Sequence, residues 1–415
     1  MTARLTDRLF SRLIKRGRLE IRYASGETSI FGEPTPGLPD VAVHFTDDRV
    51  PRDLILDPRL GAGEAYMDGR VVVERGDIME LVGLVQANNA WERRTKLMAP
   101  SFSRRITDGI GFVVRQFNKP TSSRKNVAHH YDVGNELYKL MLDSEHMQYS
   151  CAYWPREDMT LEQAQEAKLA HIAAKLAIGP GMKVLDIGCG WGGMAIYLAR
   201  KYGVEVHGIT LSEEQIALAN SRAQAAGVAD KTRFELVDYR ELDGRGFTYD
   251  RIVSVGMFEH VGKPQFETFF RTCANLLTGD GVMLLHTIGR MGKPGRTDAF
   301  TDKYIFPGGY IPALSETFEA SEKMRLMPTD TETLRLHYAK TLRQWYKRCV
   351  ENREAIVALF DERFYRMWTF YLSGSVAAFE SGGMCNYQFQ FARNRNALPL
   401  TRDYIEAEER RLLAE

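Results

Sequence analysis

Cysteine is scarce in this 415-residue chain, and long apolar runs are absent from it. The dispersed cysteines form no Cys-x-x-Cys pair, which argues for reduced thiols and against a disulfide framework or a zinc site. No apolar run is long enough for a membrane span and no signal-peptide core is visible, so we expect a cytoplasmic protein whose membrane contact is peripheral. The formal net charge is +1, so the overall charge indicates no nucleic-acid partner. The five cysteines are Cys151, Cys189, Cys273, Cys349 and Cys385.

Charge is concentrated locally instead. Residues 1–18 combine Arg and Lys with Leu5, Leu9 and Leu13 at helical spacing, which predicts a short basic amphipathic helix. Residues 92–125 are also rich in Arg and Lys. These stretches read either as a solvated helix and linker or as a surface that docks on anionic phospholipid, at up to about 1 kcal/mol per basic side chain.

The length and the 44% hydrophobic content suit two or three domains. Alternating residues at 19–23 and 41–45 predict strands of a small α+β module. A polar, turn-rich segment at 118–126 indicates a boundary. We expect an N-terminal lipid- or membrane-associated module over 1–118, a linker over 119–128 and a second domain over 129–415.

In the second domain, strands alternate with helices, which predicts an α/β fold with a doubly wound parallel sheet and ligand sites at the carboxyl ends of the strands. A segment rich in Gly, Pro and Thr, at about 289–335, predicts an inserted lid, and 386–393 predicts a last edge strand. The predicted strands are 183–187, 204–209, 233–236, 249–255 and 281–286. The predicted helices are 161–178, 194–201, 213–226 and 264–277.

The stretch 184–193, Val-Leu-Asp-Ile-Gly-Cys-Gly-Trp-Gly-Gly, carries the most specific signal. Gly188, Gly190 and Gly193 have the G-x-G-x-x-G spacing of a turn between a strand and a helix, in which a nucleotide-like ligand contacts the backbone. Dinucleotide and S-adenosylmethionine sites both use this pattern, so further residues must distinguish them.

The next two strand ends favour S-adenosylmethionine over NAD. Thr210 stands where a dinucleotide site carries the acid that binds the ribose. Asp186 suits the first loop of a methyltransferase, where it would position the amino-acid part of the cofactor, and Thr210 and Gln215 would contact the ribose. Asp238 would accept the amino hydrogens of adenine, and Tyr239 would cover the base.

Four further segments lie outside these loops: 149–154 (Tyr-Ser-Cys-Ala-Tyr-Trp), 257–262 (Met-Phe-Glu-His-Val-Gly), 285–289 (Leu-His-Thr-Ile-Gly) and 336–340 (Leu-His-Tyr-Ala-Lys). With the glycine loop, they resemble the cyclopropane fatty acid synthases, which include the mycolic acid cyclopropane synthases. The resemblance covers roughly 127–395, and more loosely the N-terminal region through Gly-Glu-Ala-Tyr-Met-Asp-Gly69. It implies a class I S-adenosylmethionine methyltransferase-like sheet behind a small N-terminal α+β domain. We also assign Tyr149, Ser150, Gly192 and Leu211 to the cofactor site.

The resemblance implies methyl transfer to the cis double bond of a phospholipid acyl chain, followed by proton loss and ring closure. It also implies that a bound bicarbonate accepts the proton, held by Cys151, Glu259, His286 and Tyr338 with backbone near Ile288. Tyr338 and His286 would donate hydrogen bonds, and Glu259 would orient His286 or accept the bicarbonate hydroxyl. Cys151 would offer its thiol or its backbone amide.

Methylation of an alkene leaves a carbocation, so the site should be dry and lined by aromatic faces, each contributing about 0.5–2 kcal/mol. Ordinary core packing is the competing interpretation for every candidate. The candidates are Tyr131, Tyr153, Phe258, Tyr304, Phe306 and Tyr310.

Two residues are assigned no chemistry. Cys189 reads as a small packed residue of the glycine loop. Ser375 stands where many members of the family carry a cysteine, which argues against a covalent thiol mechanism there.

Three alternatives remain open at this point: methylation of the same alkene to a branched, unsaturated chain, a non-catalytic lipid-binding protein, and a methyltransferase for a small amine or phenol. A homodimer is implied by resemblance only, as is peripheral association with the inner face of the membrane.

Overall fold

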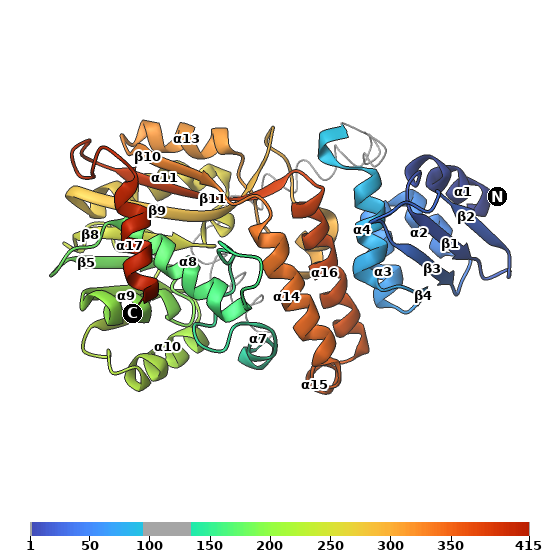
Figure 1. Cartoon of the computed structure of the whole chain (residues 1–415), viewed down its shortest axis with the longest axis horizontal. Coiled ribbons are helices and arrows are strands. Elements are labelled where there is room, and N and C mark those ends of the chain that lie inside the picture. Colours follow the sequence, from blue (N-terminus) through green and yellow to red (C-terminus); the bar gives the residue numbers. More distant parts are fainter. Residues whose placement is uncertain (1, 94–133, 415) are drawn as a thin grey trace. The chain divides into compact units, whose positions relative to one another are not determined.

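The computed structural model describes residues 2–93 and 134–414 (Figure 1). Contacts divide the chain into two compact units. The sequence predicted a single boundary between two domains, whereas unit 1 also includes two segments from the predicted second domain. The expected linker at 119–128 lies outside the described residues. Unit 1 comprises Met1–Gly111, Thr297–Pro307 and Leu342–Met384, and unit 2 comprises Phe112–Arg296, Gly308–Thr341 and Cys385–Glu415.

Unit 2 is built on a seven-stranded sheet with the order β10-β11-β9-β8-β5-β6-β7. The five strands from β5 to β9 pair in parallel, which confirms the doubly wound α/β prediction, and β10 and β11 pair antiparallel. The strands are β5 (Lys183–Ile187), β6 (Glu205–Thr210), β7 (Thr232–Leu236), β8 (Tyr249–Val255), β9 (Leu277–Arg290), β10 (Met327–Thr333) and β11 (Met384–Ala392).

The prediction of a last edge strand is wrong. Strand β11 lies between β9 and β10, because β10, which the sequence pattern did not reveal, pairs with its outer side. The segment expected as a lid also contains regular structure, in helices α12 (Ala299–Tyr304) and α13 (Leu314–Lys323) as well as β10.

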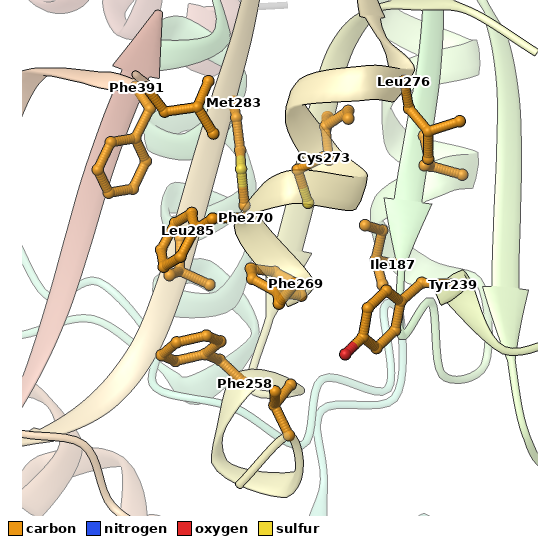
Figure 2. Packing of buried hydrophobic residues seen from close by; sticks show 14 of the residues in the cluster. Ile187, Tyr239, Phe258, Phe269, Phe270, Cys273, Leu276, Met283, Leu285 and Phe391 are labelled. Atoms are coloured by element: carbon orange, nitrogen blue, oxygen red, sulfur yellow. The ribbon is translucent and has the colours of Figure 1, made fainter. Parts of the chain in front are cut away.

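Helices cover both faces of the sheet. Successive residues of a strand point to opposite faces, so Val184 joins a core cluster with α8 and α9, whereas Leu185 joins a second cluster with α11. The second cluster is rich in aromatic rings and includes Phe269 and Phe270 (Figure 2). The remaining helices of unit 2 are α7 (Asn135–Met141), α8 (Leu161–Leu176), α9 (Gly193–Tyr202), α10 (Glu213–Ala225), α11 (Phe266–Leu276) and α17 (Asp403–Ala414).

Unit 1 has a four-stranded sheet with the order β2-β1-β3-β4, as expected of a small α+β module. Helices α3 and α4 pack against α16, and α12 packs against α3. A Cβ at Gly63 would lie 2.4 Å from Cδ2 of Phe300, so this approach of α12 to α3 requires glycine. The elements are β1 (Arg18–Arg22), β2 (Thr28–Phe31), β3 (Asp40–Phe45), β4 (Val71–Arg75), α1 (Thr2–Leu13), α2 (Val50–Leu56), α3 (Pro58–Met67), α4 (Ile78–Asn88), α15 (Arg353–Leu359) and α16 (Glu362–Glu380); α14 (His337–Glu351) runs from unit 2 into unit 1.

The expected basic helix is present as α1, and most of its apolar side packs within unit 1, with Leu5, 45% exposed, as an exception. Leu13 is buried in the core of unit 1 and Leu9 is half-buried. Arg8 and Arg12 are exposed. Contact of α1 with a membrane would therefore depend on its charge rather than on insertion of an apolar face. Among the described helices, none has the length and apolar character needed to cross a membrane.

Candidate functional site

The glycine loop joins β5 to α9 at the carboxyl edge of the sheet. Gly188 has φ +82°, and a Cβ there would lie 2.7 Å from Cβ of Met257. Gly192 has φ +78° and directly precedes α9. Gly190 has φ +52°, and a Cβ built there would meet no heavy atom within 4 Å. Backbone is therefore exposed to open space at Gly190, as a cofactor loop requires.

Asp186 lies at the end of β5 and is 2% exposed. Its Oδ2 has no hydrogen-bond partner among the described residues. Burial raises the pKa of this carboxyl to about 7, and the nearby Lys168 opposes the shift. An unpartnered buried carboxylate oxygen is costly, so this atom is suited to accept from a ligand.

The end of β6 carries Thr210 and Gln215, both buried. Thr210 Oγ1 donates to Gln215 Oε1 over 2.7 Å, and Ser212 caps α10 by accepting from the Gln215 amide. Leu211, between them, is half-buried. The fold thus places the two predicted ribose-site residues together at one strand end, with Leu211, assigned to the cofactor site, between them.

The end of β7 differs from the expectation in one respect. Asp238 is buried, and its two oxygens accept from Nε and NH2 of Arg240, over 2.8 and 2.5 Å. The sequence reasoning assigned no role to Arg240. Carboxylate oxygens have further lone pairs, so Asp238 retains the capacity to accept from a ligand. The ring of Tyr239 packs edge-on against Phe269, 5.4 Å between centroids, within the aromatic cluster (Figure 2).

The segment Gln148–Cys151 is held against α8 by side chains that the sequence reasoning missed. Gln165 Nε2 donates to the backbone oxygens of Gln148 and Ser150, over 3.3 and 3.0 Å. Lys168 Nζ donates to Ser150 Oγ over 3.0 Å and to Gln148 Oε1. The available signal was a set of polar residues, Gln165 and Lys168 among them, at the helical spacing of a core-facing side of α8. Tyr149 packs edge-on against Tyr138, 5.0 Å between centroids.

Glu259 follows β8 in a short 3-10 helix and is 6% exposed. Its Oε1 accepts from the backbone amide of Ile288 over 2.6 Å, and its Oε2 has no partner among the described residues. Burial raises the pKa of Glu259 to about 7. Because the amide of Ile288 is used in this bond, backbone contact of a further ligand at Ile288 would involve its carbonyl.

His286 on β9 is buried between two amides of β11. Asn386 Nδ2 lies 2.8 Å from Nε2 of His286, and Gln388 Nε2 lies 3.2 Å from Nδ1. Burial lowers the pKa of His286 well below its usual value, so the ring is neutral. A neutral imidazole has one donor and one acceptor nitrogen, so one of the two amides must present its oxygen. Sequence reasoning missed both amides, because nothing in the strand pattern shows which face meets His286.

The thiol of Cys151, which is 1% exposed, donates to the backbone oxygen of Ala152 over 3.3 Å, and Asn386 lies beside it and opposes the rise of its pKa. Burial raises the pKa of this thiol, so it is uncharged at neutral pH. Asn386 therefore contacts both Cys151 and His286. His286 and Ile288 are two residues apart on β9, so they point to the same face of the sheet. The contact of Glu259 with Ile288 and that of Asn386 with His286 therefore lie at the same end of β9. Tyr338, near the start of α14, is 7% exposed.

The described candidates for the aromatic lining belong to both units. Tyr131 lies outside the described residues. Phe258 is fully buried in the aromatic cluster (Figure 2). It also stacks on Phe266, 4.3 Å between centroids, which supports the interpretation of a core residue. Tyr153 stacks between His171 and His337, 4.2 and 5.1 Å between centroids.

The other three candidates bind neighbours within their own units. Tyr310 donates its hydroxyl to Glu316 in unit 2. In unit 1, Tyr304 donates to Glu64 over 2.8 Å, and the ring of Phe306 meets that of Tyr371. Cys189 is buried, as expected of a packed residue.

Comparison with known proteins agrees with this geometry. The family model for mycolic acid cyclopropane synthetase matches residues 118–389, and a domain of unknown function matches residues 5–93. Cyclopropane-fatty-acyl-phospholipid synthase of Escherichia coli is 39% identical over 347 residues, which cover 83% of this chain and 86% of the relative. Tuberculostearic acid methyltransferase UfaA1 of Mycobacterium tuberculosis is 32% identical, over a match that covers 94% of this chain and 92% of the relative.

Two solved structures are similar to about two thirds of this chain. The cyclopropane synthase MmaA2 from Mycobacterium tuberculosis has a TM-score of 0.62 at 35% identity, covering 65% of this chain and 98% of that one. Mycolic acid cyclopropane synthase CmaA1, complexed with SAH and CTAB, has a TM-score of 0.61 at 36% identity, with the same coverage. The chain therefore belongs to the mycolic acid cyclopropane synthetase family, whose members are S-adenosylmethionine-dependent methyltransferases.

Proposed function

We propose that this enzyme transfers the methyl group of S-adenosylmethionine to the cis double bond of phospholipid acyl chains and closes a cyclopropane ring, with a bound bicarbonate as proton acceptor. The observation that carries the proposal is a pair of buried carboxylates, Asp186 and Glu259, each with one oxygen lacking a partner among the described residues. The first lies beside the open glycine loop, and the second lies beside the group around His286.

The chain fits S-adenosylmethionine at the first carboxylate. This cofactor supplies an electrophilic methyl group on a sulfonium centre. Asp186 Oδ2 is suited to accept from its amino group, and the backbone at Gly190 leaves room for it. Thr210 and Gln215 lie at the next strand end for the ribose, and Asp238 lies at the third for the base.

The second carboxylate supports a bound proton acceptor, because its described neighbours Cys151 and His286 are not free bases and its own Oε2 is available to bind such an acceptor. The Cys151 thiol is uncharged, both nitrogens of His286 face amides, and Glu259 Oε1 is engaged by Ile288. Bicarbonate supplies an anionic acceptor with a hydroxyl. Glu259 Oε2 would accept that hydroxyl, and Tyr338 would donate to the anion.

The burial of the residues around the proposed proton acceptor keeps water away from the reaction. Cys151, Glu259 and His286 are each 6% exposed or less. An alkene is a weak nucleophile and its methylated cation is quenched by water, so a dry site protects the reaction.

The test is a lipid assay with the full chain, S-adenosylmethionine, bicarbonate and vesicles of a cis-unsaturated phosphatidylglycerol. Proton NMR should show loss of the alkene signals and gain of cyclopropane signals. Surviving alkene signals on chains heavier by one methylene would instead establish the branched product. Unchanged lipids would refute both. In buffer depleted of carbon dioxide, turnover should fall, and it should recover when bicarbonate is added. Equal turnover in depleted and normal buffer would refute the bicarbonate assignment.

The membrane and dimer assignments are separate parts of the proposal. We infer that the exposed arginines of α1 contribute to peripheral binding at an anionic, inner-face membrane surface. Co-sedimentation with vesicles should rise with anionic lipid and fall with salt. Light scattering of the purified chain tests the homodimer directly.

A further inference from the structure

Helix α8 presents two polar side chains from its buried face to the segment that carries Cys151. Gln165 and Lys168 are three residues apart, so they lie on the same side of the helix, and both are 0% exposed. Gln165 binds the backbone of the segment, whereas Lys168 binds its side chains. A fully buried lysine is rare and requires partners for its charge and its donors.

The direction of these hydrogen bonds is determined by chemistry. A lysine ammonium has three donors and no acceptor, so it donates to Ser150 Oγ and to Gln148 Oε1. A serine hydroxyl that accepts from an ammonium still has one hydrogen of its own to donate. The lysine therefore makes Ser150 a donor towards any further partner. Gln148 is held in turn, since its Nε2 donates to the carbonyl of His146 over 3.2 Å.

The charges around Lys168 show why a cation is kept here. Asp143, Asp186 and Cys151 favour its charged form, while burial lowers its pKa to about 7. Burial lowers the pKa of two histidines, His146 and His286, and the charge of Lys168 lowers both pKa values further. Asp143 accepts from the amides of His146 and Gln148, each over 2.7 Å, and so fixes the turn that leads to Ser150.

We propose that Lys168 is a positioning residue that sets the hydroxyl of Ser150 as a hydrogen-bond donor for the carboxylate of the cofactor's amino-acid end. The inference rests on the proposed function for the identity of the cofactor. Asp186 and Ser150 then form a matched pair, in which the carboxylate accepts from the ammonium of the ligand and the hydroxyl donates to its carboxylate. Lys168 balances the buried charge of Asp186 without contacting the ligand.

The experiment compares two ligands that share the adenosine part. S-adenosylhomocysteine has the amino-acid end, and 5′-methylthioadenosine lacks it. Calorimetric titration of the full chain with each ligand should show that Lys168→Met weakens S-adenosylhomocysteine roughly ten- to a hundredfold, the size expected for a hydrogen bond to a charged group. The affinity for 5′-methylthioadenosine should be unchanged, because the adenosine contacts lie at other strand ends.

A matched control is available on the same helix. Lys175 is also 0% exposed, but its Nζ pairs with Glu332 and with Asp330. Lys175→Met removes an equally buried cation and should leave the ratio of the two affinities as in the wild type. Ser150→Ala removes no buried charge and should reproduce the selective loss, which keeps the test available if Lys168→Met does not fold. The two losses should be non-additive in the double variant.

The outcomes separate this inference from the proposed function. Equal weakening of both ligands, or no weakening of S-adenosylhomocysteine in either variant, overturns the role of Lys168. A wild-type chain that binds neither ligand removes the cofactor assignment, and this inference with it.

Discussion

Replacing Glu259 by Gln should remove a pH-dependent loss of stability that this carboxyl imposes on the folded chain. The Glu259 side chain is buried, and burial raises its pKa from the usual 4.5 to about 7 despite the hydrogen bond from Ile288. Gln has nearly the same shape and keeps an oxygen that accepts from that amide. The substitution therefore removes the charge with little change in packing.

The sign follows from the raised pKa of the folded state. Below about pH 4.5 the carboxyl is protonated in both the folded and the unfolded chain, and its ionisation has no effect on stability. Between pH 4.5 and about 7 the unfolded chain ionises first, so stability falls as the pH rises, and above about 7 the full loss is present. The difference between the pKa of Glu259 in the folded chain and in the unfolded chain corresponds to about 3 kcal/mol of stability, at about 1.4 kcal/mol per pKa unit.

Urea unfolding at a series of pH values measures this effect. The free energy of unfolding of Glu259→Gln, relative to wild type, should increase by about 3 kcal/mol between about pH 5 and about pH 8. Glu408→Gln is the matched control, since hydrogen bonds from Arg411 and Tyr202 lower the pKa of Glu408 and its charge is constant over that range. A difference between Glu259→Gln and wild type that does not vary with pH would refute the burial argument.

Four further substitutions test other parts of the site. Gln388→Met removes the amide at Nδ1 of His286 and should lower kcat roughly tenfold without changing the affinity for S-adenosylhomocysteine; equal turnover in the variant would show that the amide does not orient the ring. Arg240→Met leaves the buried Asp238 unpaired and should lower the free energy of unfolding by about 3 kcal/mol, as urea unfolding will show. Gly190→Ala adds a Cβ that meets no heavy atom within 4 Å but strains the backbone at φ +52°, so it should lower the melting temperature slightly, and calorimetry should show weaker cofactor binding. Gly188→Ala is its counterpart, since the clash with Met257 should reduce the melting temperature further.

Much of unit 2 was predictable because its signals are local. Largely buried strands such as 183–187, capped helices, and glycines at positive φ follow from backbone geometry and short-range patterning. The same locality explains the error at β11. Whether a strand lies at an edge depends on the strand beside it, and β10 is largely exposed and polar, so it has no apolar run to reveal it.

The site residues also fall into two groups, those that local sequence patterns predict and those that only the folded structure reveals. By itself, the sequence determined the cofactor loop, the polar residues at the strand ends and the family, because these depend on residue types at fixed spacings. Only the tertiary structure decided that Lys168 lies beneath Ser150, that Arg240 pairs with Asp238, and that the amides of Asn386 and Gln388 enclose His286. Those contacts join segments whose packing depends on every intervening element, and burial, which sets the pKa of Asp186 and Glu259, exists only once the chain has folded.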